Sequence, residues 1–394
     1  MKTAAWHQKL TEIEWDFLYR IWKDECASRV ELASRHGLAR SYAGSVVERM
    51  LKYGILRESP GKSNRQGRPR IVLSLNPSLF SVMGITLLHG GQYANVKMQD
   101  AAGETLSDSY LTLPGSIRRW EDRCMRLAQM ITEKMNGQIP ANCLGACLVT
   151  TGTMSPKKGI CLQSANFNDA IRMPILKYLQ ALNIPLEIAN VTTAAVIQEH
   201  LCGRARGLDY FLQFSNTCEG MGAYSNGVYQ PGEQSNFGEI GGMESGEGNG
   251  KKEFSSLTPI HKIDDRLFPR YKGDTSFGKQ YSGAYYSFEE ALIRACREGD
   301  TLTRQQLRRH SEIFAPILQN IVLMMDPEAI VLPSWCAAAP EESIEILQTY
   351  LAAHRTVASS RELRILTSAF SERDIARGAC LLFLDRFFRR HRKI

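Results

Sequence analysis

Residues 28–51 read SRVELASRHGLARSYAGSVVERML, and this stretch decides the fold of the N-terminal part of the chain. It predicts a short helix that begins after an N-cap at Ser28 and stops at Gly37, a residue type that favours tight turns. A second helix is expected over about residues 40–53, because its apolar residues recur at i, i+3, i+4, i+7 and i+8 and form one buried stripe. Two helices joined by a glycine turn are typical of a helix-turn-helix, whose second helix enters the major groove of DNA.

The flanking residues extend this pattern to a winged helix-turn-helix. Residues 11–25 place Trp15, Leu18 and Ile21 at helical spacing, which predicts a further helix. A strand is expected to begin within residues 53–58, and residues 71–75 alternate as the return strand. Between them, residues 59–70 form a basic loop without an acidic residue. A helix pair that serves packing alone, with a flexible solvated loop, is the alternative.

The DNA contacts expected from this unit fall into two groups. The polar residues off the apolar stripe of the second helix are candidates for the major groove. They are Arg40, Ser41, Tyr42, Ser45 and Arg49. The loop residues are candidates for the minor groove and the phosphates, because proline keeps the segment Gly67-Arg-Pro-Arg70 extended and cationic. They are Lys62, Arg65, Arg68 and Arg70.

Length and charge agree with a small basic unit joined to a larger neutral one. A chain of 394 residues predicts two or three domains. Residues 1–80 carry 14 Lys and Arg against 8 Asp and Glu, whereas the other 314 residues carry 34 against 33. The excess therefore lies in the first fifth of the chain, as expected for a polyanion-binding unit. No apolar run approaches the length of a membrane span, and no secretory signal is visible, so a cytoplasmic protein is expected.

The cysteines and the central part of the chain indicate an α/β protein with free thiols. The ten cysteines form no CxxC pair, and Cys143 and Cys147 lie in an apolar run that predicts a strand with core thiols. Apolar stretches that are bounded by glycines and predict strands alternate with stretches that predict helices. The strands are expected at 81–88, 93–99, 144–150 and 185–190, with helices at 119–136 and 192–201.

The chain resembles the ROK family of bacterial repressors and sugar kinases over almost its whole length. The resemblance rests on the winged unit, on Asn190 with the helix after it, and on several short motifs in order. These are Gly220-Met-Gly222, Gly238-Glu239-Ile240-Gly241, Asp326-Pro327-Glu328 and Arg377-Gly378-Ala379. It implies a DNA-binding domain at 1–80 and, at 81–394, a body of two α/β lobes of the ribonuclease-H/actin-like type. The family usually has a capping serine before the recognition helix. Here Ala39 occupies that position, and Ser41 is the alternative cap.

The resemblance also implies that the motifs for phosphoryl transfer are degenerate. Val191 stands where a family kinase has the carboxylate that accepts the sugar proton, and an isopropyl group cannot do this. Thr86 replaces the aspartate of the first phosphate loop, and Pro333-Ser334 replaces a glycine pair. Gly242 occupies the place of the zinc-binding histidine, so neither a metal nor another cofactor is expected.

A ligand pocket is the remaining expectation from the resemblance. By position, Asn166, Asn190, Glu239 and Glu253 match or approximate residues that bind sugar hydroxyl groups in the family. The alternative is that these polar groups are inherited and satisfied by the backbone. The basic C-terminal run 386–393 is interpreted as a solvated helix end.

Three functions follow from these observations. The first is a transcriptional regulator, most simply a repressor of carbohydrate genes, that binds an operator as a homodimer or tetramer and responds to a sugar or sugar-phosphate effector. The second is a sugar kinase with an accessory DNA-binding domain. The third is a regulator that responds to a protein partner and binds no small molecule.

Overall fold

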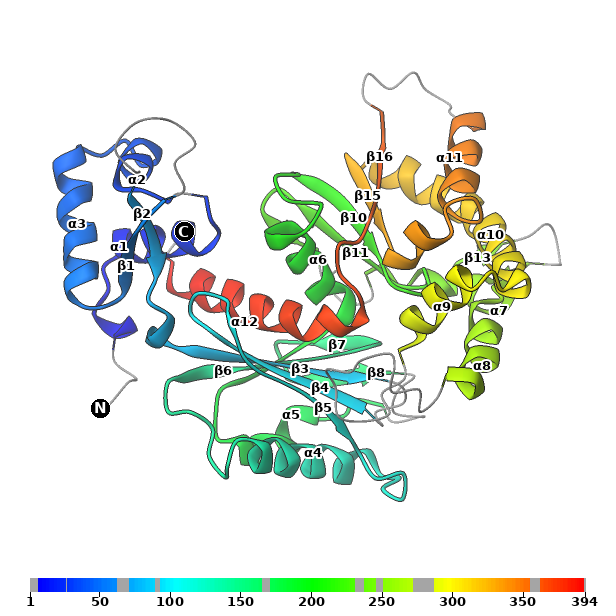
Figure 1. Cartoon of the computed structure of the whole chain (residues 1–394), viewed down its shortest axis with the longest axis horizontal. Helices are drawn as coiled ribbons and strands as arrows, with labels where there is room; N and C mark the ends of the chain where they lie inside the picture. The colour runs from blue at the N-terminus through cyan, green and yellow to red at the C-terminus, as the bar shows by residue number, and fades with distance from the viewer. Residues whose placement is uncertain are drawn as a thin grey trace.

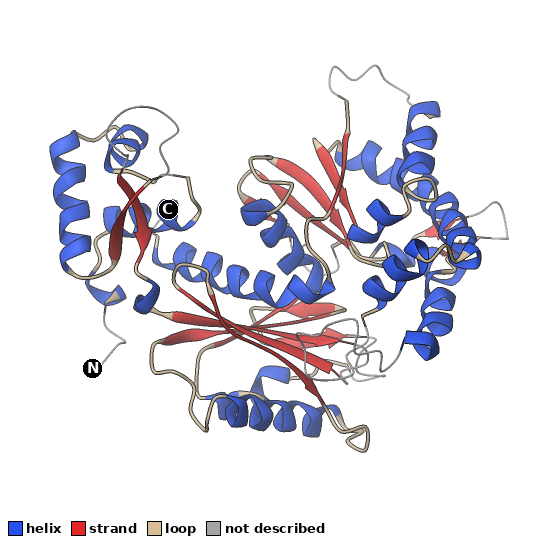
Figure 2. Cartoon of the chain, viewed as in Figure 1, coloured by secondary structure: helices blue, strands red, loops and turns tan. Residues whose placement is uncertain are grey.

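The computed structural model describes residues 6–25, 27–61, 71–88, 93–164, 171–230, 237–245, 251–271, 287–354 and 362–392. It is a mixed α/β structure with two five-stranded sheets and helices on their faces, preceded by a smaller N-terminal unit (Figure 2). The mixed α/β class expected from the sequence is confirmed. Among the described residues, no helix is long and apolar enough to cross a membrane.

The N-terminal unit, here called the head, contains three helices and one antiparallel strand pair (Figure 1). Its elements are α1 (Glu12–Trp22), α2 (Arg29–Arg35), α3 (Arg40–Lys52), β1 (Leu56–Pro60) and β2 (Ile71–Leu75). The Ser28 hydroxyl accepts a hydrogen bond from the Glu31 N–H, as the predicted N-cap should. Gly37 has a φ of 61°, which a residue without a Cβ adopts easily.

The N-cap of α3 is not the serine that the sequence offered as an alternative. Ala39 is the N-cap of α3 although its side chain makes no capping bond. The Ala39 carbonyl already accepts the first helical hydrogen bond, from the Ala43 N–H at 3.0 Å. The helix therefore begins at Arg40, and a shift of the cap to Ser41 is wrong.

The first lobe is built on a sheet with strand order β5-β4-β3-β6-β9. Its strands are β3 (Ser81–Leu88), β4 (Tyr93–Asp100), β5 (Thr105–Thr112), β6 (Cys143–Thr150) and β9 (Leu186–Asn190). Helices α4 (Trp120–Lys134) and α5 (Ile175–Tyr178) lie below this sheet in Figure 1, and α12 (Ile375–His391) lies above it. A short pair, β7 (Thr153–Ser155) and β8 (Ile160–Gln163), follows β6. Cys143 and Cys147 lie in β6, in agreement with the predicted strand.

The second lobe has the strand order β12-β11-β10-β15-β16. Its strands are β10 (Tyr210–Phe214), β11 (Met221–Ser225), β12 (Val228–Tyr229), β15 (Ala329–Leu332) and β16 (Arg364–Thr367). One face carries α6 (Val191–Cys202). Its other helices are α7 (Phe254–Leu257), α8 (Ile260–Tyr271), α9 (Phe288–Arg297), α10 (Thr301–Met325) and α11 (Ile344–Ala353), and β13 (Glu244–Ser245) pairs with β14 (Lys252–Glu253).

Helix α12 joins the lobes and the head into one packed structure. Two glycines allow α12 to approach its neighbours closely. A Cβ on Gly378 of α12 would lie 2.6 Å from the Ala194 carbonyl oxygen of α6. A Cβ on Gly84 of β3 would overlap the Ala376 carbonyl of α12. The far end of α12 packs on the head, where the ring of Trp15 stacks on His391 with centroids 4.6 Å apart. One hydrophobic core therefore runs from the head into the body.

A buried polar contact fixes the same junction. Asp385 of α12 is 2% exposed, and its carboxylate accepts hydrogen bonds from the Tyr19 hydroxyl at 3.1 Å and from Arg389 Nε at 2.7 Å. Asp16 of α1 forms an ion pair with Arg392, and its Oδ2 lies 2.8 Å from His36 Nε2. The basic C-terminal run is thus partly engaged with the head and is not simply a solvated helix end.

Candidate nucleic-acid interface and interlobe pocket

All five candidate residues for the major groove, Arg49 included, are exposed on α3. Arg40, Ser41, Tyr42 and Ser45 are exposed, whereas the stripe formed by Ala43, Val46, Val47 and Met50 is buried against the head. Half of the Tyr42 surface is exposed. The spacing predicted by the sequence therefore places a polar, aromatic and cationic face on the outside of the head.

Arg49 differs from the other four in that its exposed guanidinium is paired with a buried carboxylate. Its Nε donates to Glu14 Oε1 at 2.7 Å, and Glu14 is only 1% exposed. The other oxygen of Glu14 accepts the backbone N–H of Thr11 at 2.8 Å, so this carboxylate ties the start of α1 to α3. The guanidinium of Arg49 accordingly neutralises a buried charge within the head.

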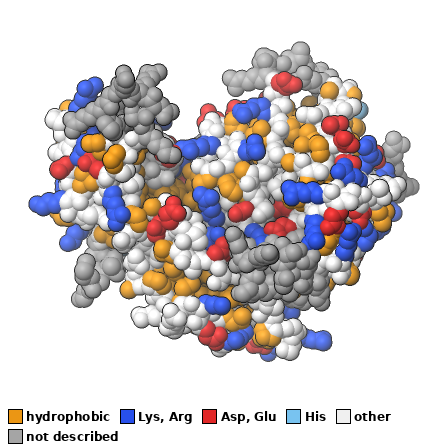
Figure 3. All heavy atoms as spheres, in the orientation of Figure 1, with side chains coloured by type: hydrophobic (Ala, Val, Ile, Leu, Met, Phe, Trp, Pro, Cys, Tyr) orange, Lys and Arg blue, Asp and Glu red, His pale blue; other side chains and the backbone are white. Residues whose placement is uncertain are grey.

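The candidate residues of the basic loop, Lys62, Arg65, Arg68 and Arg70, lie outside the described residues. The strands that this segment joins are described. Pro60 at the end of β1 pairs with Ile71 at the start of β2. In the space-filling view, Lys and Arg side chains are spread over the visible surface of the head (Figure 3).

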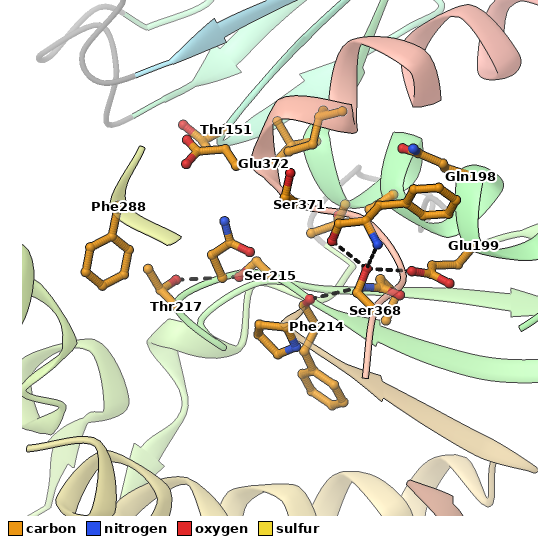
Figure 4. Close-up of a pocket in the computed structure, with 18 of the residues that line it drawn as sticks. Thr151, Gln198, Glu199, Phe214, Ser215, Thr217, Phe288, Ser368, Ser371 and Glu372 are labelled. Carbon is orange, nitrogen blue, oxygen red and sulfur yellow. Dashed lines mark hydrogen bonds between the residues drawn. The ribbon is translucent and has the colours of Figure 1, made fainter. Parts of the chain in front are cut away.

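A pocket of about 340 Å³ lies between the two lobes (Figure 4). The first lobe contributes Leu87 of β3 and Thr151 after β6. The rest of the lining comes from α6, the end of β10 with the loop after it, α8, α9, Pro333 after β15 and the segment that leads into α12. The lining residues include Val191, Gln198, Glu199, Gln213, Ser215, Asn216, Thr217, His261, Asp264, Phe288, Ser368, Ser371, Glu372 and Ile375. This volume is at the lower end of the range of small-molecule sites, which is about 300–1,000 Å³.

The charged groups of the pocket are mainly acidic. Glu199, Asp264 and Glu372 line it together with His261, and no lysine or arginine stands among its described lining residues. His261 Nε2 lies 2.9 Å from Glu219 Oε1, and this hydrogen bond raises the pKa of the imidazole. The carboxylate of Glu219 thus offsets the positive charge that His261 gains on protonation.

One of these carboxylates is held in place by the structure. Glu199 Oε1 accepts the Ser368 hydroxyl (Figure 4) and the Ala369 N–H at 2.8 Å, and Oε2 accepts the Arg204 N–H at 2.8 Å. Glu199 therefore fastens the segment before α12 to α6.

The residues suggested for sugar binding do not converge on this pocket. The Asn190 Oδ1 accepts the Thr192 N–H at 2.8 Å and so caps α6, as the alternative interpretation expected. Glu239 and Glu253 are exposed, and none of these three lines the interlobe pocket. Asn166 lies outside the described residues. Sequence reasoning missed Gln198 and Gln213, since nothing in the local pattern distinguishes a buried glutamine from a surface one.

The positions that matched kinase motifs lie in or near the pocket. Val191 and Pro333 line it, and the Ser334 hydroxyl donates to the carboxylate of Glu289 behind it. Glu289 is fully buried, and this burial raises its pKa to about 7. Among the described residues, no group of three or more His, Cys, Asp and Glu could hold a metal ion.

Two sheets of five strands with a pocket between them define a two-lobed α/β protein. The family model described as "ROK family" matches residues 83–386. The chain belongs to the ROK family, and the resemblance inferred from the sequence is confirmed.

Known proteins similar to this chain include regulators and kinases. A xylose repressor of Caldicellulosiruptor bescii is 20% identical over 391 residues, which cover 93% of this chain and 94% of the repressor. A crystal structure of a ROK family transcriptional regulator, described as a homologue of the Escherichia coli MLC protein, has a TM-score of 0.71 at 17% identity and covers 96% of this chain and 98% of its own. The ROK glucokinase of Streptomyces griseus, solved with glucose and AMPPNP, has a TM-score of 0.58 at 14% identity and covers 77% of this chain and 98% of its own.

Proposed function

We propose that the chain is a sequence-specific DNA-binding transcriptional regulator, a repressor of genes for carbohydrate uptake or catabolism. The observation that carries this proposal is the exposed polar face of α3, with Arg40, Tyr42 and Ser45, on a head that precedes the ROK body. The named relative is a repressor, and the regulator structure matches nearly the whole chain, including the head. We assign the head, residues 1–80, as a winged helix-turn-helix domain and residues 81–394 as the effector and dimerisation body.

In this proposal α3 is the recognition helix and the basic loop is the wing. Arg40 and Tyr42 contact bases or backbone in the major groove, and Arg68 and Arg70 contact the minor groove and the phosphates. Two heads on a symmetric homodimer or tetramer read a pseudo-palindromic operator. An effector that prefers one arrangement of the heads changes operator affinity by its differential binding to the two states.

Fluorescence anisotropy with operator fragments found by genomic footprinting tests this assignment. The double variant Arg68→Ala/Arg70→Ala should weaken operator binding strongly and flatten its salt dependence by about one unit of slope for each phosphate that is no longer neutralised. The variant Arg119→Ala removes a charge from an exposed position next to α4 of the body and serves as the matched control. If the double variant bound the operator as tightly as the wild type, the assignment of the basic loop as the wing would be refuted.

We propose that the body does not transfer phosphate, because Val191 lines the pocket at the position of the proton acceptor. An assay of ATP-dependent phosphorylation over a panel of hexoses and amino sugars tests this. Turnover would show that a carboxylate of the pocket, such as Asp264 or Glu372, takes over this role, and it would favour the kinase with an accessory DNA-binding domain.

A further inference from the structure

A buried carboxylate of the head is fully hydrogen-bonded and lies directly behind the second half of α3. Glu14, in the first turn of α1, is 1% exposed. Its Oε2 accepts the Thr11 N–H and the Thr11 hydroxyl, each at 2.8 Å, and its Oε1 accepts Arg49 Nε at 2.7 Å. A charge is buried in a protein only where it is paired and hydrogen-bonded. Glu14 and the guanidinium of Arg49 therefore form one unit.

The other edge of the Arg49 guanidinium faces outward. A guanidinium has five N–H donors, of which one is on Nε and four are on the two Nη atoms. The Arg49 side chain is 45% exposed. Its Nη2 lies 3.4 Å from the Thr11 hydroxyl, which is long for a hydrogen bond, and Nη1 has no partner among the described residues. Glu14 thus fixes the guanidinium through Nε and leaves the Nη edge open to a ligand.

The place of Arg49 on α3 indicates which ligand this edge can meet. Arg49 lies four residues after Ser45 and seven after Tyr42, so the three side chains follow one another along one side of the helix. Ser45 and Tyr42 belong to the face proposed to enter the major groove, and a recognition helix contacts bases near its beginning. Arg49 is near the end of α3, where a helix inserted in this way leaves the groove beside the phosphates.

Another arginine of the head shows a different arrangement. Arg29 of α2 donates through Nη2 to Glu48 at 2.8 Å and through Nη1 to Glu58, so both of its Nη atoms are already used within the head. Arg49 is held through Nε instead. It keeps the pair of parallel donors that binds a phosphate in bidentate fashion.

We propose that Glu14 is a positioning residue for DNA binding, which holds Arg49 so that its two Nη atoms bind a phosphate of the DNA backbone. The long side chain is then ordered before the DNA arrives, and less conformational entropy is lost on binding. This proposal rests on the proposed function for the presence of DNA at α3. It assigns Arg49 to the backbone and not to a base, and it gives a buried acidic residue a favourable role in binding a polyanion.

Fluorescence anisotropy of the full chain with the operator and with a scrambled duplex of the same length tests the proposal. Glu14→Gln removes a negative charge from the head, so electrostatic attraction alone would tighten binding to both duplexes. We expect the opposite. Binding to both should weaken by about twofold to tenfold, because the released Arg49 side chain must be ordered on binding. Equal or tighter binding by the folded Glu14→Gln variant would overturn the proposal.

A second substitution separates positioning from a purely structural role. Arg49→Ala should weaken binding to both duplexes by about tenfold or more and reduce the salt slope by about one. In the Arg49→Ala background, Glu14→Gln should no longer weaken binding, since no guanidinium is left to position. The same loss from Glu14→Gln in both backgrounds would show that Glu14 acts only on the fold of the head. A loss from Arg49→Ala on the operator alone would assign Arg49 to a base. Either result would contradict the proposal.

Two further variants control for charge and folding. Arg49→Lys keeps the charge but loses the planar guanidinium that can be held through Nε, so it should also weaken binding to both duplexes. Affinity equal to that of the wild type would mean that the charge alone suffices. Glu31, near the start of α2, accepts the Ala27 N–H at 2.8 Å, and Glu31→Gln removes the same charge as Glu14→Gln. This control should not weaken binding, and a loss as large as that of Glu14→Gln would contradict the proposal. Circular dichroism at the assay temperature shows that each variant is folded.

The proposed function and the role of Glu14 fail in distinguishable ways. A wild-type protein that binds both duplexes equally would refute the sequence-specific regulator, and the variants would still be compared on either duplex. A wild-type protein that prefers the operator, together with a Glu14→Gln variant that binds as tightly, would refute the role of Glu14 alone. A wild-type protein that binds neither duplex would refute both proposals.

Discussion

At the scale of single residues, Glu289 makes the stability of the second lobe depend on pH. Its carboxylate is buried behind the pocket and accepts the Glu372 N–H at 2.7 Å. Burial raises its pKa to about 7 from an ordinary value of 4.5. The folded state keeps this proton to higher pH than the unfolded chain does. The contribution of Glu289 to the free energy of unfolding therefore decreases as the pH rises from about 4.5 to 7. Above pH 7 this contribution is constant.

Glu289→Gln should remove this dependence, because the amide stays uncharged at every pH. The free energies of unfolding of the variant and of the wild type are measured with urea. Their difference, variant minus wild type, should increase by up to roughly 3 kcal/mol between pH 4.5 and pH 8. Glu133→Gln, at an exposed position of α4, is the control and should leave the pH profile unchanged. Parallel profiles for Glu289→Gln and the wild type would show that the carboxylate ionises freely in the folded state.

At the scale of elements, the crossing of α6 and α12 depends on Gly378. A methyl group there would overlap the Ala194 carbonyl oxygen, so Gly378→Ala should force the helices apart and cost about 1–3 kcal/mol. The same substitution at Gly44 of α3, where no atom of the described residues lies within 4 Å of the added Cβ, should be neutral or stabilising. Thermal melting of the two variants compares their stabilities. Equal melting temperatures would mean that α12 can move away from α6 without a loss of stability.

The docking of α1 on α12 depends on Asp385 more than on either of its partners. Asp385→Ala leaves the Tyr19 hydroxyl and the Arg389 guanidinium without their common acceptor, and it should cost about 2–4 kcal/mol. Tyr19→Phe removes one hydrogen bond and keeps the ion pair, so it should cost about 1 kcal/mol. Urea unfolding gives both values. If Tyr19→Phe proves as costly as Asp385→Ala, the hydroxyl and not the carboxylate holds the junction.

At the scale of the whole molecule, the shared core predicts that the head and the first lobe unfold together. Trp6, Trp15 and Trp22 lie in or against this core, whereas Trp120 and Trp335 belong to the cores of the two lobes. In the variant Trp120→Phe/Trp335→Phe, fluorescence reports on the head junction alone. Its urea transition should coincide with that of circular dichroism. A separate, earlier fluorescence transition would show that the head is an independent unit.

The sequence predicted much of this molecule because local patterns specify local structure. The apolar stripe of α3, the Ser28 cap and the strands β3, β4, β6 and β9 follow from local patterns, whereas β5 of the same sheet was not predicted. Long-range packing was not predictable in the same way. Nothing near Arg49 in the sequence indicates that Glu14 lies beside it, and the site residues transferred from the family did not include Gln198 or Gln213. These contacts arise from elements that are distant in the chain.

The head sits on α12, and this has a consequence for biosynthesis. Residues 6–25 leave the ribosome before the two lobes, whereas the helix on which they rest, α12, is translated after them. Until then the indole rings of Trp6, Trp15 and Trp22 lack the surface that covers them. Domains generally fold in the order of synthesis, and exposed apolar side chains on a nascent chain invite aggregation and the binding of chaperones. The apolar surface of the head is therefore covered only once the last turn of α12 has emerged.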